Sequence, residues 1–136
     1  MKTLVLYYSY SGNTKHIAEK IAADESADIV EVKDVRRPGK LKAYTAGIFA
    51  AIRGKTWLIQ ALTTDFTAYE RLILLFPIWA DNPPPAFNTV LAQLPQGKTV
   101  AFKMVSMSGR SDCQARLEAA LAAKDCTLES FEDIKS

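Results

Sequence analysis

The segment 70–76, Glu-Arg-Leu-Ile-Leu-Leu-Phe, constrains the fold more than any other part of the chain. Its apolar side chains do not alternate with polar ones, so a strand formed here is apolar on both faces. Such strands are typical of the centre of a parallel sheet, because crossover helices cover both faces of these sheets. The segment therefore predicts a layered α/β fold.

The remaining strands and helices alternate along the chain. Four further strand candidates are short runs of β-forming residues, at 3–8, 28–33, 99–105 and 126–131. Helix candidates lie between the strands, at 13–24, 41–53, 86–93 and 113–124. This alternation predicts βαβ units with right-handed crossovers. A length of 136 residues fits a single domain that spans 1–136.

The composition excludes several classes of protein. Net charge is +2, with 17 Lys and Arg against 15 Asp and Glu, which is too balanced for a nucleic-acid binder. No apolar run approaches the roughly 18 residues that a membrane span needs. Cys113 and Cys126 form neither a zinc-binding spacing nor a CxxC pair, which favours reduced thiols. We expect a soluble, cytoplasmic protein with no nucleic-acid or membrane partner.

The end of the chain predicts an incompletely covered sheet. Only residues 132–136 follow the fifth strand candidate, so we expect no final helix. Alternation along that strand places Thr127, Glu129 and Phe131 on one face. A charge such as Lys103 in the fourth strand is costly to bury without a partner. We therefore expect this face to be open to solvent or to a second copy of the chain, as in a homodimer.

A loop rich in short polar residues follows the first strand and precedes the first helix. It consists of Ser9, Tyr10, Ser11, Gly12, Asn13 and Thr14. A helix N-terminus supplies amide donors and a favourable dipole for a phosphate group, and hydroxyl side chains add donors. Glycine permits a tight turn with close backbone approach. The alternative is that these residues only turn the chain and cap the helix.

A second loop follows the segment 70–76 and is stiffened by prolines. Its candidate binding residues are Pro77, Ile78, Trp79, Ala80, Asp81 and Asn82. In a doubly wound sheet, ligands bind outside the carboxyl ends of the strands. Trp79 there would offer a stacking surface for a flat heterocycle. The alternative is an ordinary core or rim aromatic residue.

A third loop follows the fourth strand candidate on the same predicted edge of the sheet. Its candidate residues are Ser106, Met107, Ser108, Gly109 and Arg110. They could surround the polar rim of a ring. The alternative is a plain connection whose helix is capped by Ser111.

Other chemistry finds little support in the sequence. The run Gly97-Lys98-Thr99 is like the end of a P-loop, but Ala92 stands where the first glycine belongs. His16 is the only histidine, so no Ser-His-Asp arrangement is expected. We predict no catalytic side chain and no metal site, which leaves any redox chemistry to a cofactor.

Two of the loops resemble those of a known family. Residues 9–14 resemble the phosphate signature of flavodoxins, and Pro77-Ile78-Trp79 followed by prolines resembles the flavin-stacking loop of short-chain flavodoxin-like proteins. The resemblance implies a three-layer α/β sandwich with a five-stranded parallel sheet in the order 2-1-3-4-5. It also implies flavin mononucleotide (FMN) at the switch point between strands one and three.

The resemblance also assigns roles to the loops. By this resemblance the loop 9–14 binds the phosphate, Trp79 stacks on the isoalloxazine, and Ile78 and Ala80 meet the ring edge through their backbone. The loop 106–110 contacts the pyrimidine end of the ring. It departs from the family in lacking consecutive glycines.

The resemblance implies an FMN-dependent redox protein that transfers electrons through the flavin. It would act either as a carrier for a redox partner protein or as a small reductase with a nicotinamide donor. Few acids lie near the ring loops, only Asp81 and Asp112, with Arg110 between them. A nearby cation favours the anionic reduced flavin. The alternative is a flavin-free binding or regulatory module that keeps the fold.

Overall fold

In the part of the chain that the structure describes, nine elements alternate between strand and helix. In this computed structural model the described residues are 2–8, 12–33, 65–78, 85–109, 111 and 113–135. The strands are β1 (Thr3–Tyr7), β2 (Asp28–Glu31), β3 (Arg71–Pro77), β4 (Thr99–Ser106) and β5 (Thr127–Lys135). The helices are α1 (Asn13–Glu25), the 3₁₀ turn η2 (Phe66–Ala68), α4 (Pro85–Gln93) and α5 (Gln114–Ala122). The helix expected at 41–53 lies outside the described residues.

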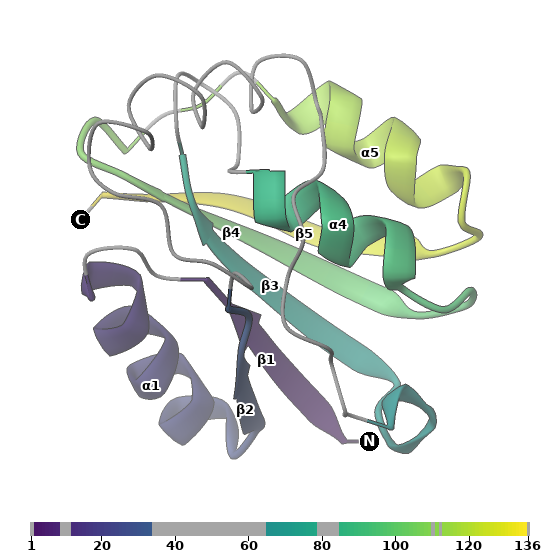
Figure 1. Cartoon of the computed structure of the whole chain (residues 1–136), viewed down its shortest axis with the longest axis horizontal. Coiled ribbons are helices and arrows are strands. Elements are labelled where there is room, and N and C mark those ends of the chain that lie inside the picture. The colour runs from purple at the N-terminus through teal and green to yellow at the C-terminus, as the bar shows by residue number, and fades with distance from the viewer. Residues whose placement is uncertain are drawn as a thin grey trace.

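All five strands pair in parallel, in the order β2-β1-β3-β4-β5. The expected fold class and strand order are therefore confirmed. Helix α1 lies on one side of the sheet, and α4 and α5 lie on the other, which gives three layers (Figure 1). Among the described residues, no helix is long and apolar enough to cross a membrane.

Strand β3 is the centre of the core, as its sequence predicts. Leu72, Leu74 and Phe76 pack on the α4 and α5 side, and Ile73 and Leu75 pack on the α1 side. All five side chains are fully buried. Full burial of such a side chain stabilises the fold by about 1.5–3 kcal/mol. An apolar run without alternation is therefore what this position requires.

Strand β5 differs from the sequence prediction in length and in facing. Residues 132–135, expected to follow the strand, belong to it. A register shift at Val100/Ala101 leaves one extra residue in β5, which reverses the alternation beyond it. Phe131 therefore packs against Phe102 at 6.2 Å between ring centroids, on the α4 and α5 side. The expected shared face of Thr127 and Phe131 is wrong, because strict alternation does not allow for a bulge.

The α1 side of the sheet carries ion pairs over β3, β4 and β5. Lys103 keeps 19% of its side chain exposed and donates to Glu132 at 2.9 Å. It is thus not enclosed, as the sequence predicts, and it has the partner that a half-buried charge needs. A second copy of the chain on this face stays a prediction.

Arg71, at the amino end of β3, makes ion pairs with two other elements on this face. Its guanidinium donates to both carboxylate oxygens of Glu129, at 2.8 and 2.6 Å, and also pairs with Glu25 at the end of α1. The hydrogen bonds from Arg71 lower the pKa of the Glu129 carboxyl. A bidentate contact between an arginine and a carboxylate is stronger than an ordinary ion pair. Arg71 thus links α1, β3 and β5.

Replacing Arg71 should destabilise the fold more than replacing Lys103. We expect Arg71→Gln to cost about 1 kcal/mol of unfolding free energy, since the group is partly exposed. Lys103→Gln, the matched control with one bond to an exposed carboxylate, should cost less than half as much. Because the folded-state pKa of Glu129 is lowered, this stabilisation is present above about pH 4.5 and is lost as pH falls through the folded value. Urea unfolding at pH 7 and pH 3 measures both effects; a constant Arg71 cost across that range contradicts the assignment.

Candidate functional site

The carboxyl ends of β1, β3 and β4 meet at one edge of the sheet, which we call the carboxyl edge. Tyr7, the last residue of β1, pairs with Leu75 of β3, and Pro77 at the end of β3 pairs with Val105 of β4. The three loops that follow these strands therefore begin side by side. This is the edge where doubly wound sheets bind ligands.

Helix α1 begins at the carboxyl edge. Gly12 is its N-cap, with φ +99°, and as a glycine it contributes no side-chain cap. A Cβ built on Gly12 would meet nothing within 4 Å, so the space beside it is open. Amide donors in such a first turn attract anions. The alternative, that the neighbours of Gly12 cap the helix, concerns side chains that lie outside the described residues.

Thr14 lies one residue inside this helix and is 4% exposed. It is the only buried polar residue among the described parts of the chain. Within those parts no other side chain hydrogen-bonds to its hydroxyl, and buried hydroxyls usually have a partner. Thr14 therefore holds a buried polar group in the first turn of α1. Ser9, Tyr10 and Ser11, and the side chain of Asn13, lie outside the described residues.

The second loop leaves β3 next to the end of β4. Pro77 is the last residue of the strand, and the amide of Ile78 donates to the carbonyl of Val105 at 2.9 Å. Beneath this point Tyr8 stacks on Phe76, with ring centroids 6.2 Å apart and planes 2° from parallel. This packing fixes where the loop starts. Trp79, Ala80, Asp81 and Asn82 lie outside the described residues.

The third loop turns tightly after β4. The amide of Gly109 donates to the Ser106 hydroxyl at 3.0 Å, and Gly109 has φ +72°. Met107 is 86% exposed, and Ser108 is exposed as well. The structure thus places Ser106 to Gly109 at the carboxyl edge, as predicted. Arg110 lies outside the described residues.

Ser111 does not cap the following helix, so this part of the alternative is wrong. The N-cap of α5 is Cys113, without a side-chain hydrogen bond. The Ser111 hydroxyl instead donates to Asp133 Oδ1 at 2.6 Å. Asp133 belongs to the last part of β5, which sequence reasoning left outside the sheet. The charged run Glu-Asp-Ile-Lys has no strand signature that could have revealed it.

Two titratable groups near the carboxyl edge, Tyr7 and Cys113, are held in their neutral forms. Burial, together with Glu31, which accepts a 3.1 Å hydrogen bond from Tyr7, raises the pKa of Tyr7 to about 12. Burial raises the pKa of the Cys113 thiol. Neither group can readily exchange a proton at neutral pH. In the described residues no three His, Cys, Asp or Glu side chains gather as a metal site would require.

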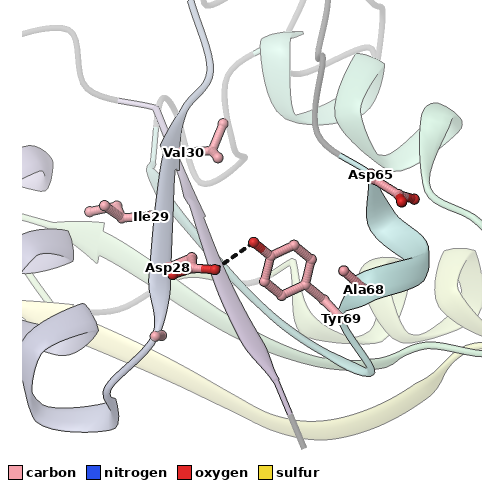
Figure 2. A pocket seen from close by; sticks show the side chains of 7 residues that line it. Asp28, Ile29, Val30, Asp65, Ala68 and Tyr69 are labelled. Atoms are coloured by element: carbon pink, nitrogen blue, oxygen red, sulfur yellow. Dashed lines mark hydrogen bonds between the residues drawn. The ribbon is translucent and has the colours of Figure 1, made fainter.

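A separate open pocket lies at the opposite, amino end of β2. Figure 2 shows Tyr69 pointing toward β2, where its hydroxyl donates to Asp28 Oδ2 at 2.6 Å. Asp65, on the same rim, accepts from the Thr67 hydroxyl and amide, which lowers the pKa of its carboxyl. These contacts join β2 to η2 and lie far along the strands from the loops considered above. The pocket therefore does not belong to the carboxyl edge.

Comparison with known proteins supports the fold independently. No protein-family model and no curated protein sequence matches the chain. Among solved structures, a flavoprotein in complex with FMN from Lactobacillus acidophilus NCFM superposes with TM-score 0.79 and 25% identity, covering 96% of this chain and 91% of that chain. Two-electron reduced Megasphaera elsdenii flavodoxin gives TM-score 0.60 and 15% identity, with coverage of 97% and 87%. A flavodoxin of Streptococcus pneumonia TIGR4 gives 0.56 and 16%, with 100% and 87%. The chain thus has the flavodoxin-like fold, and the resemblance seen in its sequence is confirmed.

Gly109 should tolerate a side chain less well than Gly97. Both have positive φ, but a Cβ on Gly109 would lie 3.1 Å from the Lys135 Cβ, whereas one on Gly97 would meet nothing within 4 Å. We expect Gly97→Ala to cost about 1 kcal/mol from backbone strain alone, and Gly109→Ala to cost at least 1 kcal/mol more. Thermal unfolding of the two variants measures the difference. Equal melting temperatures would show that the loop does not pack against β5.

Proposed function

We propose that this chain binds FMN at the carboxyl edge and transfers electrons through the bound flavin. The observation that carries the proposal is that α1 begins at Gly12, with open space beside it, on the same edge as the loops after β3 and β4. The FMN complex of the similar Lactobacillus acidophilus flavoprotein supports the choice of cofactor. The doubly wound strand order supports the choice of edge, because such sheets bind ligands outside the carboxyl ends of their strands.

The start of α1 fits the phosphate of FMN. Open space beside Gly12 would admit a group that a Cβ would obstruct, and the first-turn amides would donate to it. Thr14 would add its buried hydroxyl. Ser9, Ser11 and Asn13 are proposed phosphate ligands from the sequence pattern. A dianionic group at this point also gains from the helix dipole.

The loops after β3 and β4 fit the flavin ring. Ile78 is anchored to Val105 by its backbone, so the residues that follow it leave the sheet from a fixed point. Trp79 is proposed to stack on the ring from there. The Ser106–Gly109 turn would meet another edge of the ring and offers backbone and hydroxyl groups to it. The chain supplies binding and orientation, whereas the flavin supplies the redox chemistry when it is bound.

Electrons would pass to or from a partner outside the chain. Met107, 86% exposed in the third loop, offers an apolar contact at the rim of the proposed site. Either a redox partner protein or a nicotinamide donor could approach there. A cytoplasmic location stays a prediction.

FMN binding tests the proposal directly. We expect the purified protein to quench FMN fluorescence on titration and to show a perturbed flavin absorbance. Gly12→Ala should weaken FMN binding at least tenfold, because its methyl group enters the proposed phosphate space. It should leave riboflavin binding nearly unchanged, because riboflavin has no phosphate.

Gly97→Ala is the matched control for that variant, since it has the same kind of backbone strain in open space away from the carboxyl edge. It should bind FMN as the wild type does. Unchanged FMN affinity in Gly12→Ala would refute the phosphate site. A colourless protein that ignores added FMN would refute the function and favour the flavin-free module.

Arg110 should raise the reduction potential of the bound flavin. A nearby cation stabilises the anionic reduced form, and a net gain of about 1.4 kcal/mol corresponds to about 30 mV for a two-electron couple. We expect Arg110→Ala to lower the potential by about that amount in a spectroscopic redox titration. Arg116→Ala, in the following helix, is the control and should leave the potential unchanged. Identical potentials for wild type and Arg110→Ala would exclude a role for the arginine.

A further inference from the structure

The last residues of β5 contact the third loop through side chains. The Ser111 hydroxyl donates to Asp133 Oδ1 at 2.6 Å, and the Cys113 thiol lies 3.7 Å from the Ser111 oxygen, within reach to donate to it. Ser111 is half-buried, and Cys113 is 2% exposed. The Ser111 hydroxyl therefore acts as donor and acceptor at once, which fixes its orientation.

The backbone of the same loop also rests on β5. A Cβ on Gly109 would come within 3.1 Å of the Lys135 Cβ, so the loop and the strand are in close contact there. Ser106, where the loop begins, pairs with Lys135, and Met104 pairs with Asp133. The strand thus supports the loop at its start, at Gly109 and at Ser111.

The Ser111–Asp133 contact is the strongest of these supports. It joins a neutral hydroxyl to a carboxylate, and such charge-assisted bonds are shorter and stronger than neutral ones. Burial keeps the Cys113 thiol protonated, so that it remains a donor at neutral pH. Ser111 is thereby withdrawn from capping α5 and held against the sheet.

We propose that Asp133 is a positioning residue of the flavin site, which holds the loop 106–109 in its binding geometry through Ser111. The inference rests on the proposed function, because the loop matters only if it meets the ring. Asp133 itself would touch no cofactor. Asp133 would affect the ring only through the loop. Replacing Asp133 should therefore leave binding of the phosphate unchanged.

Three variants separate hydrogen bonding from charge and from general damage. Asp133→Val removes the acceptor, whereas Asp133→Asn keeps an acceptor oxygen of the same size. Glu132→Gln changes the neighbouring carboxylate, which points to the opposite face and pairs with Lys103. We expect Asp133→Val to weaken FMN and riboflavin binding by the same factor, about tenfold, since the loss lies at the ring. Asp133→Asn should stay within about threefold of wild type, and Glu132→Gln should bind as wild type does.

A double-mutant cycle tests whether the two residues act as a pair. Ser111→Ala should weaken the binding of FMN and of riboflavin as much as Asp133→Val does. The double variant should bind both flavins only slightly more weakly than either single variant. Additive losses would overturn the proposal, as would wild-type binding by Ser111→Ala. If Asp133→Val does not fold, Ser111→Ala and Asp133→Asn carry the test. A loss confined to FMN, with riboflavin unaffected, would also overturn it.

Hydrogen exchange in the flavin-free protein gives a readout independent of binding. The Gly109 amide donates to Ser106 inside the supported loop, so its exchange should quicken about tenfold in Ser111→Ala and Asp133→Val but not in Glu132→Gln. Unchanged exchange would overturn the proposal. If wild type binds no flavin while exchange responds as expected, the proposed function fails and the loop support stands.

Discussion

Strand β3 pairs with β1 on one side and with β4 on the other. This pairing determines where the helical layers pack and where the loops of the carboxyl edge begin. Its register brings the ends of three strands to one edge of the sheet. Its five fully buried side chains attach both helical layers to the same strand. A shift of one residue in either pairing would exchange the two faces of a strand. The carboxyl edge therefore depends on the packing of β3 on both sides.

The two ends of the sheet use polar groups in different ways. At the amino end Arg71 has partners within the chain, as Lys103 has in the middle of β4, so the charge on the α1 side is neutralised locally. At the carboxyl end, α1 begins at Gly12 with open space beside it, and Thr14 is buried in the first turn of the helix. The proposal of a ligand at the carboxyl edge rests on this difference between the two ends.

The bulge in β5 decides which residues of this strand face the α1 side of the sheet and which face the third loop. It adds one residue beside Val100 and Ala101, which packs Phe131 against the core and puts Asp133 on the side of Ser111. Without it, Asp133 would lie on the other face, where Lys103 and Glu132 pair. One inserted residue thus supplies both an aromatic side chain packed against the core and a support for the third loop.

The sequence by itself determined the layers, the strand positions and the polar loop that begins α1, because each depends on local residue patterns. Apolar runs, Gly12 and the proline-rich turn after β3 can all be recognised within a few residues. Only the tertiary structure decided how far β5 extends, which way Phe131 faces and what Ser111 contacts. These features depend on the neighbouring strand. Because β4 continues to Ser106, its backbone groups need partners, and the charged residues 132–135 supply them by joining the sheet. A local pattern holds no record of that partner.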